Sequence, residues 1–169
     1  MNVIDNAWKV PLTAGGIYKI VVDEDKIELY RIFSGKYISD ELKLKKDIEY
    51  IDSLIVPGAT DPVEPADLFN RLKNTVKKIT EEYYARESSK MENIKKNMTS
   101  PCYETIELTG IKNINMSDFN DDRFPELIIN TERFIFLFTN FSEPSADDKK
   151  RYNEIKKIIE HLKNKIGID

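Results

Sequence analysis

The most regular part of this sequence reads ELIINTERFIFLF at residues 126–138 and SADDKKRYNEIKKIIEHLKNKI at residues 145–166. In the first segment two apolar runs flank the polar step Asn130-Thr131-Glu132, which predicts two antiparallel strands joined by a tight turn. In the second segment apolar residues recur every three or four positions, which predicts an amphipathic helix. A strand pair followed by a helix indicates an α+β fold.

The helix predicted over residues 145–166 has clear ends. Ser145 is an N-cap residue, Asp147 and Asp148 suit the positive end of the helix dipole, and Gly167 can end the helix. Its apolar seam consists of Tyr152, Ile155, Ile159, Leu162 and Ile166. We expect this seam to close the core against one face of the hairpin, formed either by Phe134, Phe136 and Phe138 or by Ile135 and Leu137.

The first third of the chain is rich in β-branched and aromatic residues. Residues 17–22 and 26–33 flank the polar turn Asp23-Glu24-Asp25, which predicts a β-hairpin that opens at Gly15-Gly16. Residues 1–14 are expected to be an irregular lead-in that anchors Trp8. Further strands are expected at residues 37–38, 42–44 and 48–56, so residues 1–57 are predicted to form an N-terminal β part.

A helical insertion is predicted over residues 66–98, after a connector at residues 58–65 that contains Gly58, Pro62 and Pro65. The apolar residues Phe69, Leu72, Val76, Ile79 and Tyr83 form one stripe at alternating spacings of three and four. The stripe is interrupted at Ser88-Ser89, so the insertion is either one long helix or two shorter ones.

Residues 103–166 are predicted to return to strands and to end in the C-terminal helix. Residues 103–108 alternate with period two, residues 111–116 form a further short strand, and residues 117–125 form an acidic loop. At 169 residues the chain fits a single domain. The predicted fold is α+β: a bent antiparallel sheet or partial barrel, closed by the C-terminal helix and carrying a long helical insertion.

The order of the last elements resembles pleckstrin-homology-like domains. The resemblance covers residues 103–166: strands at Ile111, Leu127 and Arg133, followed by one amphipathic helix. It implies that the helix plugs the open end of a bent sheet, with residues 17–33 as opening strands. Members that bind phosphoinositides place basic residues in the first hairpin turn, where this chain has Asp23-Glu24-Asp25, and many members have a tryptophan in the last helix, which this chain lacks.

Composition excludes several classes of site. Hydrophobic residues make up 40% and charged residues 33% of the chain, as in ordinary globular proteins. One cysteine and one histidine exclude an internal disulfide, a cysteine-based zinc site and the usual Ser-His-Asp arrangement. Neither an apolar span of about 20 residues nor a leader segment is found, so we expect a cytoplasmic protein. The abundance of Lys, Ile and Asn suggests a bacterial or phage source.

No catalytic, cofactor-binding or metal-binding residue is assigned. Asp118, Asn120 and Asp122 have the opening spacing of a calcium loop, but Arg123 stands where glycine is required and Ile129 where the bidentate glutamate belongs. The turn at residues 23–25 is interpreted as a hairpin tip. His161 is interpreted as a residue at a helix end and Cys102 as a small buried apolar residue.

Residues 66–98 carry eight basic and five acidic residues, whereas the whole chain has a net charge of -4. We therefore treat this segment as the candidate binding surface. Its candidate interface residues are Phe69, Leu72, Val76, Tyr83 and Tyr84. Its candidate basic face is Lys73, Lys77 and Lys78. Because these lysines flank an apolar stripe and are interleaved with acids, a protein partner or a second copy of the chain is favoured over nucleic acid.

The first hypothesis for function is a non-catalytic intracellular binding or regulatory module that acts through protein-protein contacts, such as an inhibitor-type factor without a cofactor. Its basis is the lack of a nucleophile with a base, a phosphate loop or a metal cluster in the sequence. One alternative is a metal-dependent hydrolase or nuclease that uses Asp and Glu clusters. Another is a membrane-surface adaptor, which the acidic turn at residues 23–25 disfavours.

Overall fold

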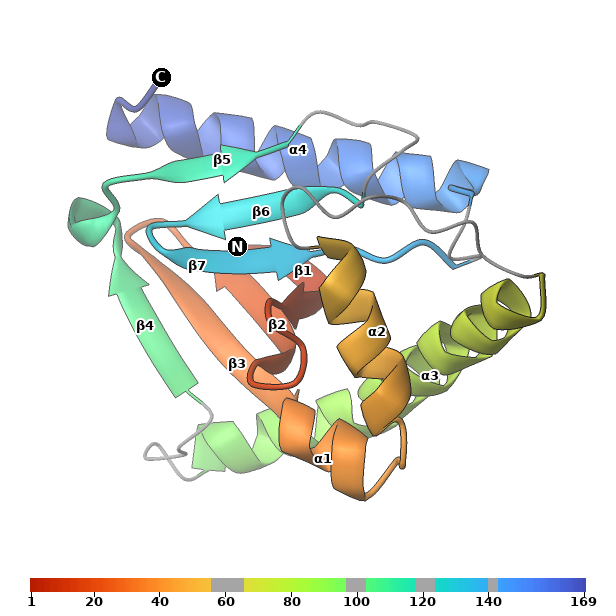
Figure 1. Cartoon of the computed structure of the whole chain (residues 1–169). Coiled ribbons are helices and arrows are strands. Elements are labelled where there is room, and N and C mark those ends of the chain that lie inside the picture. The colour runs from red at the N-terminus through yellow and green to blue at the C-terminus, as the bar shows by residue number, and fades with distance from the viewer. Residues whose placement is uncertain (56–65, 97–102, 118–123, 140–142) are drawn as a thin grey trace.

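The computed structural model describes residues 1–55, 66–96, 103–117, 124–139 and 143–169. The strands within these ranges are β1 (Asn2–Lys9), β2 (Gly16–Val22), β3 (Lys26–Ser34), β4 (Tyr103–Glu107), β5 (Ile114–Met116), β6 (Glu126–Ile129) and β7 (Glu132–Ile135). The helices are α1 (Gly35–Asp40), α2 (Lys45–Ile55), α3 (Ala66–Lys96) and α4 (Ala146–Ile166), and a short 3-10 helix, η1 (Leu108–Gly110), follows β4. Figure 1 shows α4 along β5 and β6, with α1, α2 and α3 gathered at the opposite side of the molecule.

All described strands belong to one antiparallel sheet with the order β4-β3-β2-β1-β7-β6-β5. The outermost strands, β4 and β5, are consecutive in the chain and are joined only by residues 108–113. A flat sheet would separate them by about 29 Å, whereas this link spans at most about 25 Å. The sheet must therefore curl toward closure without pairing its edges. The α+β prediction, with a long helix and a C-terminal helix, is confirmed.

The first strand was not expected from the sequence. β1 pairs with β2 on one side and with β7 on the other, and Trp8 is fully buried within it. The prediction of an irregular lead-in is wrong because a bulge hides the alternating pattern. Asp5 and Asn6 together lie opposite Lys19, and Asn6 has a positive φ of 52°.

Residues 35–40 and 45–55 are helical and residues 41–44 link the two helices, so the strands predicted at 37–38, 42–44 and 48–56 are wrong where the structure describes them. Ser34 caps α1 by accepting a hydrogen bond from the amide of Tyr37. The apolar residues Leu44, Ile48, Ile51 and Ile55 follow helical spacings of four, three and four. Their β-branched side chains favoured a strand, but packing of one stripe against the sheet decided the local structure.

Within the described residues, α3 is a single helix that continues through Ser88 and Ser89. Leu72, Val76, Ile79 and Tyr83 are buried with Trp8, Ile17, Ile32 and Ile135 in a cluster on one face of the sheet. The opposite face carries a second cluster beneath α4. Strands β1, β2 and β3 are therefore covered on both sides.

The helix α4 has the ends that the sequence predicts. Ser145 and Asp148 form a capping box, and Gly167 ends the helix in the left-handed conformation. The seam residues Tyr152, Ile155, Ile159 and Leu162 share their cluster with Phe134 and Phe136, whereas Ile135 and Leu137 face the α3 side. The ring of Phe138 packs instead on Phe124, with centroids 5.2 Å apart.

Candidate functional site

A polar groove with a volume of about 460 Å³ lies between α2 and α3. We call it the α2–α3 groove. The α2 side contributes Leu44, just before the helix, and Asp47 in the first helical turn. The α3 side contributes Asn70, Arg71, Asn74, Thr75 and Lys78. The groove exists because the inner face of each helix packs on the sheet, which leaves polar flanks facing each other.

The floor of the groove is a closed polar cluster. The carboxylate of Asp47 is buried and forms an ion pair with the guanidinium of Arg71. The buried Thr75 hydroxyl lies 2.6 Å from Asp47 Oδ2 and 3.0 Å from the Arg71 carbonyl oxygen. A buried carboxylate requires such partners, so Asp47, Arg71 and Thr75 are explained by the folding of α2 onto α3.

The packing of α2 on α3 does not account for the other residues that α3 contributes to the groove. Asn70, Asn74 and Lys78 recur at a spacing of four, which aligns them along one side of the helix. Lys78 Nζ donates to the Leu42 carbonyl oxygen at 3.1 Å, so it closes one end of the groove. Both asparagines are exposed, and neither side-chain amide is bonded to any described residue. Asparagine is less favourable than alanine inside a helix by up to about 0.7 kcal/mol, so their presence has no local structural cause.

The candidate interface from the sequence requires correction. Leu72, Val76 and Tyr83 are at most 3% exposed and belong to the core of the chain itself. Phe69 is half-buried against the same cluster. Only Tyr84 is open to solvent, at 52% exposure. The sequence predicts a partner surface here because it does not identify the sheet face that covers the apolar stripe.

The candidate basic face is divided by the structure. Lys78 lines the α2–α3 groove, whereas Lys73 and Lys77 are exposed and do not line it. On a helix, Lys73 and Lys77 are close neighbours of each other, and Lys78 points to a different side. The three lysines therefore do not form one continuous site.

A second polar cluster surrounds the bulge in β1. The side-chain amide of Asn6 accepts a hydrogen bond from Trp8 Nε1 at 2.8 Å and donates one to the Thr80 hydroxyl at 3.2 Å. Tyr83 donates to Asp5 Oδ1 at 3.0 Å, and the Arg151 guanidinium donates to the backbone carbonyl oxygens of Asp5 and Asn6. These bonds tie α3 and α4 to the same two residues of β1, so the cluster acts as a structural brace.

The pKa values of Tyr83 in this brace and of Lys19, which pairs with Asp5, are shifted in the direction that favours their hydrogen bonds, whereas burial lowers the pKa of Arg151. Burial and the neighbouring Asp5 carboxylate raise the pKa of the Tyr83 hydroxyl well above its ordinary value. Burial lowers the pKa of Lys19, but hydrogen bonds with Glu87 and Asp5 outweigh it and leave that pKa raised. Tyr83 therefore keeps its proton, and Lys19 keeps its charge.

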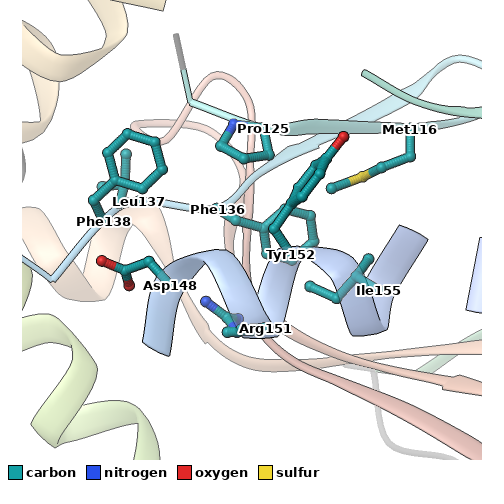
Figure 2. Close-up of a pocket in the computed structure, with 9 residues that line it drawn as sticks. All are labelled: Met116, Pro125, Phe136, Leu137, Phe138, Asp148, Arg151, Tyr152 and Ile155. Atoms are coloured by element: carbon teal, nitrogen blue, oxygen red, sulfur yellow. The ribbon is translucent and has the colours of Figure 1, made fainter. Parts of the chain in front are cut away.

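Figure 2 shows a smaller hollow between α4 and the chain that follows β7. Phe136 lies beside Tyr152 there, with Ile155 next along α4, and the remaining space is about 10 Å³, roughly the space of one water molecule. Its polar groups are already bonded: Asp148 caps α4, and the Tyr152 hydroxyl donates to the Ser117 carbonyl oxygen. The pocket is part of the packing of α4.

The turn at residues 23–25 is a hairpin tip, and the Glu24 carbonyl oxygen accepts a hydrogen bond from Lys165 at the end of α4. His161 is exposed. The loop residues 118–122 and Cys102 lie outside the described residues. In the described ranges no three His, Cys, Asp or Glu side chains are close enough together to hold a metal ion.

Comparison with protein-family models, with curated proteins and with solved structures finds no match to this chain. Of the helices in the described ranges, none has the length and apolar character needed to cross a lipid bilayer. The function must therefore be inferred from the α2–α3 groove and the surfaces around it.

Sequence reasoning missed Asn70 and Asn74. Their spacing of four with Lys78 is a readable signal on a predicted helix. That signal alone does not predict a groove, because the strand predicted at residues 48–56 leaves the groove without its second wall.

Proposed function

We propose that this protein is a non-catalytic intracellular binding module that regulates a protein partner, and that the partner binds at the α2–α3 groove. The observation that carries the proposal is the pair of exposed asparagines, Asn70 and Asn74, which line a hollow of about 460 Å³ without bonding to any described residue. Exposed polar residues that the fold does not use are common in binding sites.

The electrostatics of the groove agree with a binding role. Its buried acid, Asp47, is neutralised by Arg71, and the other charged residue in the lining is the cation Lys78. The chain as a whole has a net charge of -4. The groove is thus a locally positive site on an acidic molecule, which favours a partner of opposite charge.

We also propose that the sheet and α4 belong to the pleckstrin-homology-like architectures. The support is the order of seven antiparallel strands followed by one C-terminal helix, with α1, α2 and α3 inserted between β3 and β4. Such a scaffold would hold the inserted helices rigidly, but a fold alone does not assign a function.

The proposal is tested by affinity capture of host proteins on the full chain. The variant Asn74→Trp fills the groove with a bulky side chain, and Lys150→Trp places the same side chain on the exposed surface of α4. We expect quantitative mass spectrometry to identify a host protein that binds the wild type and the Lys150→Trp control but is depleted on Asn74→Trp. Retention of the same proteins by all three chains would exclude the groove as the binding site.

A further inference from the structure

We propose that the α2–α3 groove binds an extended, acidic polypeptide segment of the partner, with Asn70 and Asn74 bonded to the backbone of the segment and Lys78 bonded to one of its carboxylates. This inference rests on the proposed function and specifies the chemistry of the ligand.

The spacing of the wall residues matches the repeat of an extended chain. Four residues of an α-helix advance 6.0 Å, at 1.5 Å each, and two residues of an extended strand advance about 6.6 Å. In an extended chain every second residue presents its N–H and C=O groups to the same side. The amides of Asn70 and Asn74 can therefore meet backbone groups two residues apart in the ligand.

The chemistry of the asparagine side chain suits this role. Each amide offers one carbonyl acceptor and two N–H donors, which is the complement of one backbone N–H and C=O pair. Contacts of this kind recognise the backbone and tolerate many side chains. They need amides without other partners, and Asn70 and Asn74 meet that condition within the described residues.

The lysines in and beside the groove favour an acidic ligand segment. One further step of four residues along α3 leads from Asn74 to Lys78, whose Nζ uses one of its three N–H groups on the Leu42 carbonyl oxygen. The other two can bind a carboxylate. Lys43 and Lys46 are exposed beside the start of α2 and add positive charge next to Leu44, which lines the groove. Exposed acids also lie nearby: Glu41 precedes Leu42 in the chain, and Glu49 pairs with Lys45 at 4.0 Å.

Nucleic acid fits the groove less well than a peptide. Binding of single strands depends on aromatic side chains that stack on bases. The lining contains none: its residues are Leu44, Asp47, Asn70, Arg71, Asn74, Thr75 and Lys78.

The test uses random peptides of about twelve residues displayed on phage and selected on the immobilised full chain. We expect the enriched peptides to contain Asp or Glu. The tightest peptide should shift the NMR signals of the Asn70 and Asn74 side-chain amides. Affinity is then measured by fluorescence polarisation at about 0.15 M salt, where charges beyond about 8 Å are screened.

Two variants test the named contacts. The double variant Asn70→Ala/Asn74→Ala should bind the selected peptide about tenfold more weakly or worse, because it loses the backbone hydrogen bonds. Its unfolding midpoint should not fall, since alanine is the better helix former, so a loss of binding cannot be attributed to misfolding. Lys78→Glu should also weaken binding, whereas Lys73→Glu, with the same change of charge outside the groove, should not.

The inference is overturned if no peptide is enriched, if the enriched peptides lack acidic residues, or if the double variant binds as tightly as the wild type. Displacement of the peptide by a single-stranded oligonucleotide at lower concentration would assign the groove to nucleic acid instead. A host protein lost on Asn74→Trp but retained by Asn70→Ala/Asn74→Ala would leave the proposed function standing and reject the peptide-backbone contacts.

Discussion

Tyr83 connects the long helix to the bulge of the first strand. Its ring is fully buried, and its hydroxyl donates to the Asp5 carboxylate at 3.0 Å. Asp5 also lies 3.4 Å from Lys19 Nζ, so removal of the tyrosine hydroxyl leaves that carboxylate with a charged partner. A Tyr83→Phe variant should therefore keep the fold and isolate the effect of a single ionisable group.

The free energy of unfolding should depend on alkaline pH through Tyr83. Burial, followed by the Asp5 charge, keeps the hydroxyl protonated in the folded state, whereas an unfolded tyrosine ionises near pH 10. Above pH 10 the unfolded state binds fewer protons than the folded state, so stability falls as pH rises. Between pH 10 and pH 11 the wild type should lose roughly 1 kcal/mol more than Tyr83→Phe in urea titrations. Equal losses in both proteins would contradict the burial of this hydroxyl.

Among the elements, α4 should be indispensable for the sheet that it covers. Ile159 is 1% exposed within the cluster that joins α4 to the sheet. The variant Ile159→Asp would place an unpaired carboxylate there, at a cost above about 4 kcal/mol, a large part of the stability of an ordinary domain. We expect loss of cooperative unfolding by circular dichroism. Lys157→Asp, at an exposed position of the same helix, is the control and should stay folded.

The elements that the sequence predicts correctly are those whose local signals agree with one another. In α4 the cap, the apolar spacing and the final glycine all indicate the same helix, and in β2 and β3 the composition and the turn agree. Residues 45–55 show the opposite case, since β-branched composition favoured a strand while a spacing of three and four favoured a helix. The contact of α2 with the sheet decided the outcome, and that contact lies outside local sequence.

The α2–α3 groove could not be predicted for the same reason. Asn70, Asn74 and Lys78 are visible as an aligned series once residues 66–98 are interpreted as a helix. A groove also needs a second wall, which Asp47 and Leu44 supply from a helix that the sequence did not reveal. The buried role of Leu72 and Val76 likewise depends on the sheet face beneath them.

At the scale of the whole molecule, the structure removes the reason to expect self-association. The apolar stripe of α3 is covered by the sheet, and the large apolar residues that remain exposed in the described ranges are Met1, Val3 and Tyr84. A stable homodimer needs a contiguous apolar surface of several hundred Å² on each copy. Light scattering coupled to size exclusion should therefore give the monomer mass of 19.7 kDa across the concentration range accessible in solution. A mass that rises toward the dimer with concentration, and that falls again in Tyr84→Ser, would place an interface on the outer face of α3 and restore that helix as a self-association surface.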